Sequence, residues 1–164
     1  MKRKLLLLSV IISLLYSCSG GFSKGVKKDL STGLSASYNG FGLDDIYLAG
    51  GDADTRINSN TVELGSKISV MATGVDYFTE KNGKVFPGCS IILTDKSGKE
   101  ILNLPDAFAD MTEGTEKERA RTLRAQLNTG DPMLVGETYH LKTRFFDKNN
   151  KEHEIVAEVN LVMK

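Results

Sequence analysis

The sequence predicts an all-β sandwich domain of about seven to nine strands. From Leu34 onward apolar and polar residues mostly alternate with a period of two, as expected for half-buried strands. Turn residues interrupt this alternation at short intervals, and the chain shows neither a tandem repeat nor the strand–helix alternation of parallel sheets. Together these observations favour antiparallel strands packed in two layers.

The first strands follow directly from this alternation. Apolar residues alternate with serine over 34–38, and a second apolar segment over 45–49 ends at Gly50-Gly51, before the polar loop 52–60. The clearest alternation lies in 67–73. On that strand we expect Ile68, Val70 and Ala72 to face the core, and we expect lysine, serine and threonine to face water, with Met71 on the outer face.

Two later hairpins carry nearly the same turn sequence, at 95–100 and 147–152. Each begins with Asp and has Gly or Asn near its third or fourth position, which suits a type I turn followed by a left-handed residue. We therefore interpret Asp95 and Asp147 as residues that cap the backbone of their turns. The flanking strands are 90–94 with 99–104, and 138–146 with 153–163. Cys89 falls on the same strand face as Ile91 and Leu93, which predicts a buried thiol.

Residues 105–130 are ambiguous. Thr115 and Glu118 have the spacing of a capping box that opens a helix, whereas residues 122–127 alternate as in a strand. We expect a short helical turn near 115–119 followed by a strand, and the alternative is one helix that continues to Asn128. With the shorter helix, the most economical architecture is an Ig-like antiparallel β-sandwich over 34–164. The closing segment 136–147 and the strand after it resemble the last hairpin of bacterial Ig-like envelope modules.

The N-terminus has the pattern of an export signal. A basic segment, Lys2 to Lys4, precedes an apolar run from Leu5 to Tyr16, which is too short for a spanning helix. The segment Leu15-Tyr16-Ser17-Cys18 resembles the lipobox of bacterial lipoproteins. This resemblance implies a signal peptide over 1–17, cleavage before Cys18, and palmitate or another acyl chain on the Cys18 lipid anchor.

Residues 18–33 are rich in glycine and serine, which predicts a flexible tether between the anchor and the domain. Surface-exported lipoproteins of some Gram-negative lineages resemble one another in an acidic run after the lipidated cysteine, and the run Ser19-Gly20-Gly21-Phe22 lacks one. The expected location is therefore the bacterial cell envelope, on the outer membrane and facing the periplasm. Loss of Lys2, Arg3 and Lys4 with the signal leaves a mature chain three charges negative, which argues against a nucleic-acid partner.

Known catalytic patterns are absent from the sequence. It contains no Gly-x-Ser-x-Gly elbow, no phosphate-binding glycine loop and no cysteine with an obvious base, so we expect no enzyme, no cofactor and no metal. The two histidines, His140 and His153, are too few for zinc without distant ligands. Calcium remains an alternative at one end of the sandwich, because the pairs Asp44-Asp45 and Asp52-x-Asp54 flank a predicted strand.

Aromatic residues give the only hint of a binding surface. Asn82-Gly83 predicts a two-residue hairpin within 77–87. This ribbon either packs onto the core, which we favour, or projects from the sandwich and presents its aromatics to a partner. Phe146 faces away from the core if its neighbour Phe145 faces inward. The candidate binding residues are Tyr77, Phe78, Phe86 and Phe146, and the absence of Trp argues against carbohydrate.

These observations predict a lipid-anchored, non-catalytic envelope lipoprotein that binds a protein partner. One alternative is a structural subunit of a fimbria or surface layer, whose strands pair between chains. Another is an inhibitor whose loop 77–87 inserts into the cleft of an enzyme.

Overall fold

The computed structural model describes residues 23–164, so the predicted signal peptide, Cys18 and residues 19–22 lie outside the described part. It contains eleven strands and one short helix: β1 (Lys24–Asp29), β2 (Leu34–Asn39), β3 (Asp45–Gly50), β4 (Thr55–Arg56), β5 (Thr61–Val62), β6 (Lys67–Thr73), β7 (Pro87–Asp95), β8 (Glu100–Leu104), α2 (Lys117–Ala120), β9 (Thr122–Asn128), β10 (Thr138–Asp147) and β11 (Asn150–Met163). No helix among these residues is long and apolar enough to cross a membrane.

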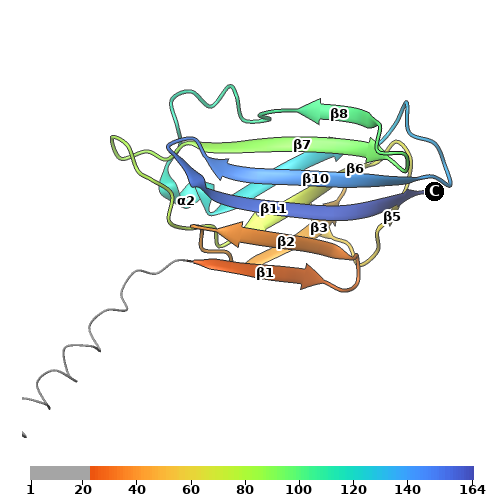
Figure 1. Cartoon of the computed structure of the whole chain (residues 1–164), viewed down its shortest axis with the longest axis horizontal. Helices are drawn as coiled ribbons and strands as arrows, with labels where there is room; N and C mark the ends of the chain where they lie inside the picture. The colour runs from red at the N-terminus through yellow and green to blue at the C-terminus, as the bar shows by residue number, and fades with distance from the viewer. Residues whose placement is uncertain (1–22) are drawn as a thin grey trace, which may run out of the picture.

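The strands form two sheets, which confirms the predicted all-β sandwich. The larger sheet has the order β1-β2-β11-β10-β7-β8, with β5 paired beside β11, and the smaller one has the order β4-β3-β6-β9 (Figure 1). Every pairing is antiparallel except that of β5 with β11. The chain changes sheet six times: between β2 and β3, β4 and β5, β5 and β6, β6 and β7, β8 and β9, and β9 and β10. One sheet therefore contains β3, β6 and β9 as neighbours, and the opposite sheet contains β8, β7, β10 and β11 in that order. This is the strand order of an Ig-like sandwich.

Additional short strands explain why the structure has eleven strands where seven to nine were expected. Strands β4 and β5 contain two residues each, too few for an alternating pattern in the sequence. Strand β1 was predicted as part of the tether 18–33, and this prediction is wrong for residues 24–29, which pair along their whole length with β2. Because β1 is an edge strand whose inward positions hold Gly25, Lys27 and Asp29, it lacks the apolar alternation that identifies a strand.

The core lies between the two sheets and uses the residues that alternation predicts. Thr143 faces inward between Leu141 and Phe145 on β10, and the inward side of β11 is almost fully buried. These inward residues of β11 are Ile155, Ala157, Val159, Leu161 and Met163. Because a shift by one residue would expose this whole set, burial fixes the register of the central pair β10-β11.

The outer side of β6 is less exposed than expected. Ile68, Val70 and Ala72 face the core as predicted, but Ser69 and Met71 are also buried. The Arg124 side chain of β9 crosses this face: its Nε donates to Ser69 Oγ at 3.2 Å and lies 3.1 Å from Asp54 Oδ1. An ion pair made by a distant loop therefore covers the face, which alternation within one strand cannot predict.

The ambiguous segment 105–130 contains one helical turn and one strand, as expected. Helix α2 has four residues, and β9 pairs with β6 along its whole length. Both predicted turn caps are also present. Asp95 Oδ1 accepts hydrogen bonds from the backbone N–H groups of Ser97 and Lys99, and Asp147 Oδ1 accepts one from the N–H of Asn149.

The strands define two ends of the sandwich. We call the end at which β1 begins the near end, and it contains loops 40–44, 74–86, 105–121 and 148–149. The opposite end, which we call the far end, contains loops 30–33, 51–66, 96–99 and 129–137 together with Lys164. Figure 1 shows β1 starting at the left and the C-terminus at the right.

Candidate functional site

The predicted aromatic ribbon lies at the near end and packs onto the core. Lys81 and Lys84 exchange two backbone hydrogen bonds of 2.8 and 3.1 Å around Asn82-Gly83, both of which have positive φ angles. This is the tight hairpin that the Asn-Gly pair predicts. Beyond the turn, Val85 exchanges two backbone hydrogen bonds with Thr115, so the ribbon is held against the loop before α2.

Only one aromatic residue of the ribbon is fully available to a partner. Phe78 is 6% exposed and its ring centre lies 4.6 Å from that of Phe41, so it is a core residue and its proposed role in binding is wrong. Phe86 is half-buried near Gly114. Tyr77, at 60% exposure, is the exception. The favoured alternative, in which the ribbon packs onto the core, therefore describes the structure.

Phe146 faces outward as expected but is covered on two sides. Its ring lies over Gly88 of the neighbouring strand, where a Cβ atom would be 2.3 Å from the ring. The Arg144 guanidinium lies 4.7 Å from the ring centre, and its Nε donates to Glu154 Oε2 at 2.5 Å. Phe146 is therefore half-buried by contacts within its own sheet, which leaves little of the ring free to anchor a partner.

Two carboxylates fix the near-end loops. Asp147 is buried, and its Oδ2 accepts a hydrogen bond of 2.7 Å from the backbone N–H of Thr79. Asp106 Oδ1 accepts from the N–H groups of Cys89 and Phe108, and its Oδ2 lies 2.8 Å from Lys148 Nζ. Burial raises the pKa of Asp106, but the hydrogen bond from Lys148 and the two N–H donors outweigh it and hold this pKa below its usual value.

The polar groups considered for metal binding are engaged elsewhere. His140 Nδ1 lies 3.0 Å from Asn160 Oδ1, and the His153 ring packs edge-on against Phe41. Three of the four candidate calcium carboxylates have basic partners: Asp45 pairs with Arg56, Asp52 with Lys67, and Asp54 with Arg124. Within residues 23–164 no three His, Cys, Asp or Glu side chains lie together as a metal site would require.

Cys89 is a core residue. Its side chain is fully buried, as its position beside Ile91 predicts, and no disulfide partner is found in the described part of the chain. Burial, with a smaller contribution from the Asp106 charge, raises the pKa of the thiol to about 12. At neutral pH the thiol is therefore protonated and unreactive.

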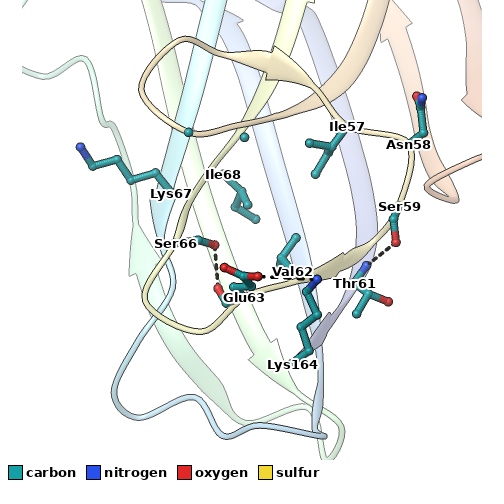
Figure 2. Close-up of a pocket in the computed structure, with 12 residues that line it drawn as sticks. Ile57, Asn58, Ser59, Thr61, Val62, Glu63, Ser66, Lys67, Ile68 and Lys164 are labelled. Carbon is teal, nitrogen blue, oxygen red and sulfur yellow. Dashed lines mark hydrogen bonds and ion pairs between the residues drawn. The ribbon is translucent and has the colours of Figure 1, made fainter.

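The far end contains an open cavity of about 350 Å³ between the two sheets (Figure 2). The apolar side chains of Ile57, Val62 and Ile68 form its interior. Figure 2 shows them directed into the space enclosed by the segment 57–68, which includes β5 and the start of β6 and which we call loop 57–68. Its rim is polar, with Ser59 Oγ accepting from the N–H of Thr61 and Glu63 lying 3.7 Å from Lys164 Nζ. An apolar interior with a polar rim is the usual composition of a recognition pocket.

A second feature of the far end is an exposed apolar loop between β9 and β10. Leu134 and Val135 are 63% and 64% exposed, although Met133 beside them is buried. The loop is held firmly, because the N–H of Leu134 donates to Tyr139 Oη and the N–H of Gly136 donates to the backbone oxygen of Met163. A further cavity of about 390 Å³ lies against Leu134 and Tyr139.

This loop was missed because its sequence has the composition of an ordinary turn. Leu134-Val135 stands between Pro132 and Gly136, and nothing in the residue types distinguishes an outward pair from two more core residues. The relevant signal is that the four consecutive residues 132–135 are all apolar, whereas a strand here would alternate. We take the cavity of Figure 2 and the apolar loop 132–135 as the candidate functional site.

No protein-family model matches the sequence of this chain, and no curated protein matches it significantly.

Proposed function

We propose that this chain is a lipid-anchored, non-catalytic lipoprotein of the bacterial cell envelope that binds a protein partner in the periplasm. The observation that carries the anchor is the N-terminal sequence, in which a basic head and an apolar run end at the lipobox-like segment 15–18. Acylation of Cys18 would hold the domain at the outer membrane without a spanning helix.

The position of β1 supports a binding role for the far end. Its first residue, Lys24, is only six positions after Cys18, and β1 begins at the near end. An anchor at Cys18 therefore keeps the near end close to the bilayer. The far end is separated from the anchor by the length of the sandwich, which for the 14 residues of β11 is about 45 Å.

The chemistry of the far end suits a protein surface. Exposed Leu134 and Val135 supply apolar contact area, and loop 57–68 supplies a cavity bordered by hydroxyl groups and the Glu63–Lys164 pair. An apolar centre with a polar rim is the common composition of a transient interface. Near-end residues are less suited, because the aromatic ribbon uses Phe78 to fill the core.

Metabolic labelling with a palmitate analogue tests the anchor. The wild-type protein is expected to carry the label and Cys18→Ala is expected to lose it, with the variant recovered in the soluble fraction. An unlabelled wild type, or equal labelling of both proteins, contradicts the anchor.

Crosslinking in cells tests the binding surface. A photo-crosslinking residue at Val135, in the protein with its anchor intact, is expected to capture one discrete protein species. The matched control places the same residue at Tyr77, which is equally exposed but lies at the near end. Capture from Tyr77 alone contradicts a far-end site, and a ladder of multiples of this chain favours the structural-subunit alternative.

A further inference from the structure

Strand β1 carries an unusual combination of residues for a free edge. Within residues 23–164 it pairs only with β2, so its other edge is open to the rest of the described chain, and its sequence places Lys24, Lys27 and Lys28 within five positions. None of the three lies within ion-pair distance of a carboxylate in residues 23–164. Val26 is 64% exposed, and Leu30 in the following turn is 92% exposed.

The carboxylates closest to this edge are neutralised within the protein. Asp29 accepts hydrogen bonds from the N–H and the hydroxyl of Ser31, and Arg56 lies 3.9 Å from Asp29 and 2.8 Å from Asp45. The hydrogen bonds from Ser31 lower the pKa of Asp29, so it stays ionised beside Arg56. The edge therefore has a local excess of positive charge, although the mature chain as a whole is three charges negative.

Protection of the edge explains the lysines but not the apolar residues. Lysine on an edge strand prevents pairing with another strand, because its charge must stay in water. Preventing strand pairing does not require Val26 and Leu30, whose apolar side chains are exposed to water at the same edge. Lysines interspersed with exposed apolar side chains are instead typical of segments that lie on an anionic bilayer.

The short connection to the predicted anchor supplies the second argument. Five peptide units separate Cys18 from Ser23, and a fully extended chain of this length spans about 18 Å. Strand β1 is itself about 20 Å long. An anchored domain therefore keeps the whole of β1 within reach of the headgroups, where a high effective concentration favours even weak contacts.

We propose that the β1 edge, from Lys24 to Leu30, docks on the anionic phospholipid surface of the membrane that holds the anchor. The inference rests on the proposed lipid anchor and adds an orientation to it: the sandwich lies on its β1 edge, so that loop 30–33 of the far end also reaches the membrane. The ammonium groups of Lys24 and Lys28, which lie on the same side of β1 as Val26, contact the headgroup phosphates, and the partly buried Lys27 adds its charge from the other side of the strand. Val26 and Leu30 enter the interfacial region. The apolar loop 132–135 precedes β10, three strands away from β1, and stays in water.

Site-specific fluorescence of the acylated full-length protein in vesicles tests this orientation. A polarity-sensitive probe is attached at Val26→Cys, and the control carries it at Leu134→Cys. Labelling is selective, because Cys18 is acylated and Cys89 is fully buried. The Val26 probe is expected to shift to the blue in phosphatidylglycerol vesicles, and less so in phosphatidylcholine, whereas the Leu134 probe is expected to report water in both.

Charge variants sharpen the test. Replacing Lys24, Lys27 and Lys28 by Gln is expected to lower the ratio of docked to undocked protein about a hundredfold, and high salt is expected to act in the same direction. The matched control replaces the exposed lysines Lys81, Lys99 and Lys151 by Gln and is expected to leave the Val26 probe unchanged.

Three other outcomes would overturn the docking of β1, and one of them would overturn the lipid anchor as well. Protein that floats with both kinds of vesicle while its Val26 probe reports water overturns the docking of β1 and leaves the anchor intact. Protein that floats with neither overturns the anchor and the docking together. A Val26 signal that depends on protein concentration but not on lipid charge shows pairing of β1 between copies, and likewise overturns the docking.

Discussion

The two ends of the sandwich differ in which residues they bury and which they expose. The near end contains the aromatic hairpin that the sequence indicates as a candidate binding surface, yet Phe78 of this hairpin packs on Phe41 in the core. Asp106 and Asp147 hold the near-end loops to the sheets. The far end has ordinary turn sequences, yet it exposes Leu134 and opens a cavity between the sheets. At the near end, aromatic residues therefore build the core, and at the far end the exposed aliphatic residues form the surface for which we propose binding.

The largest expected effect separates Phe78 from its neighbour Tyr77. Phe78→Ala removes a buried ring from its contact with Phe41 and is expected to lower the free energy of unfolding by about 3–5 kcal/mol. Tyr77→Ala removes an exposed ring and is expected to change it by less than about 0.5 kcal/mol. Urea unfolding measures both, and equal losses would mean that the ribbon does not pack as described.

The same contrast at the far end uses Met133 and Leu134. Met133 is 4% exposed, so Met133→Ala is expected to cost about 2–5 kcal/mol of unfolding free energy. Leu134→Ala is expected to leave stability within about 0.5 kcal/mol while weakening capture of the partner. A large loss of stability in Leu134→Ala would make this loop part of the core and remove it from the candidate site.

The turn aspartates Asp147 and Asp95 give a third contrast between the ends, because Asp147 is buried and Asp95 is only partly buried. Asp147→Ala leaves the N–H groups of Thr79 and Asn149 without their acceptor in a buried position, and it is expected to cost about 1–3 kcal/mol. Asp95→Ala at the far end is expected to cost less, because Asp95 is only partly buried and the turn residues 96–99 are exposed, so water can replace the lost acceptor. Thermal unfolding of the two variants compares them, and the reverse order would contradict the difference between the ends.

The pH dependence of stability tests Asp106 at the near end. Because its folded-state pKa lies below the ordinary 3.8, its contribution is complete above that value and is lost as pH falls through the folded-state pKa. Asp106→Asn is therefore expected to be less stable than wild type by about 1–3 kcal/mol at pH 7. Below about pH 4 the difference is expected to shrink. Urea unfolding at pH 7 and pH 3 measures it, and a constant difference would show that the carboxylate charge plays no part.

Alternation predicted the parts of the fold that bury one face. It located β2, β3, β6 and the final hairpin, because residues such as Ile155 and Leu161 must all point to the same core. It missed β1, whose Gly25 and Lys27 bury nothing apolar, and it missed the cover over Ser69 and Met71, which depends on the distant pair Arg124–Asp54. Contacts between remote segments leave no local pattern in a sequence.

The candidate site was less predictable for the same reason. The exposure of Leu134 depends on how loop 129–137 joins β9 of one sheet to β10 of the other, and the cavity exists only where loop 57–68 leaves a space between the sheets. Turn chemistry, in contrast, was predictable: Asn82-Gly83, Asp95 and Asp147 each adopt the role that their residue type favours.

The covalent state of the mature N-terminus tests the central claim most directly. Intact-mass analysis of the protein extracted with detergent from bacterial membranes is expected to show a chain that begins at Cys18 and carries acyl groups on that residue. A chain that retains residues 1–17, or one that begins at Cys18 with a free thiol, would contradict the anchor and with it the membrane-bound orientation of both ends.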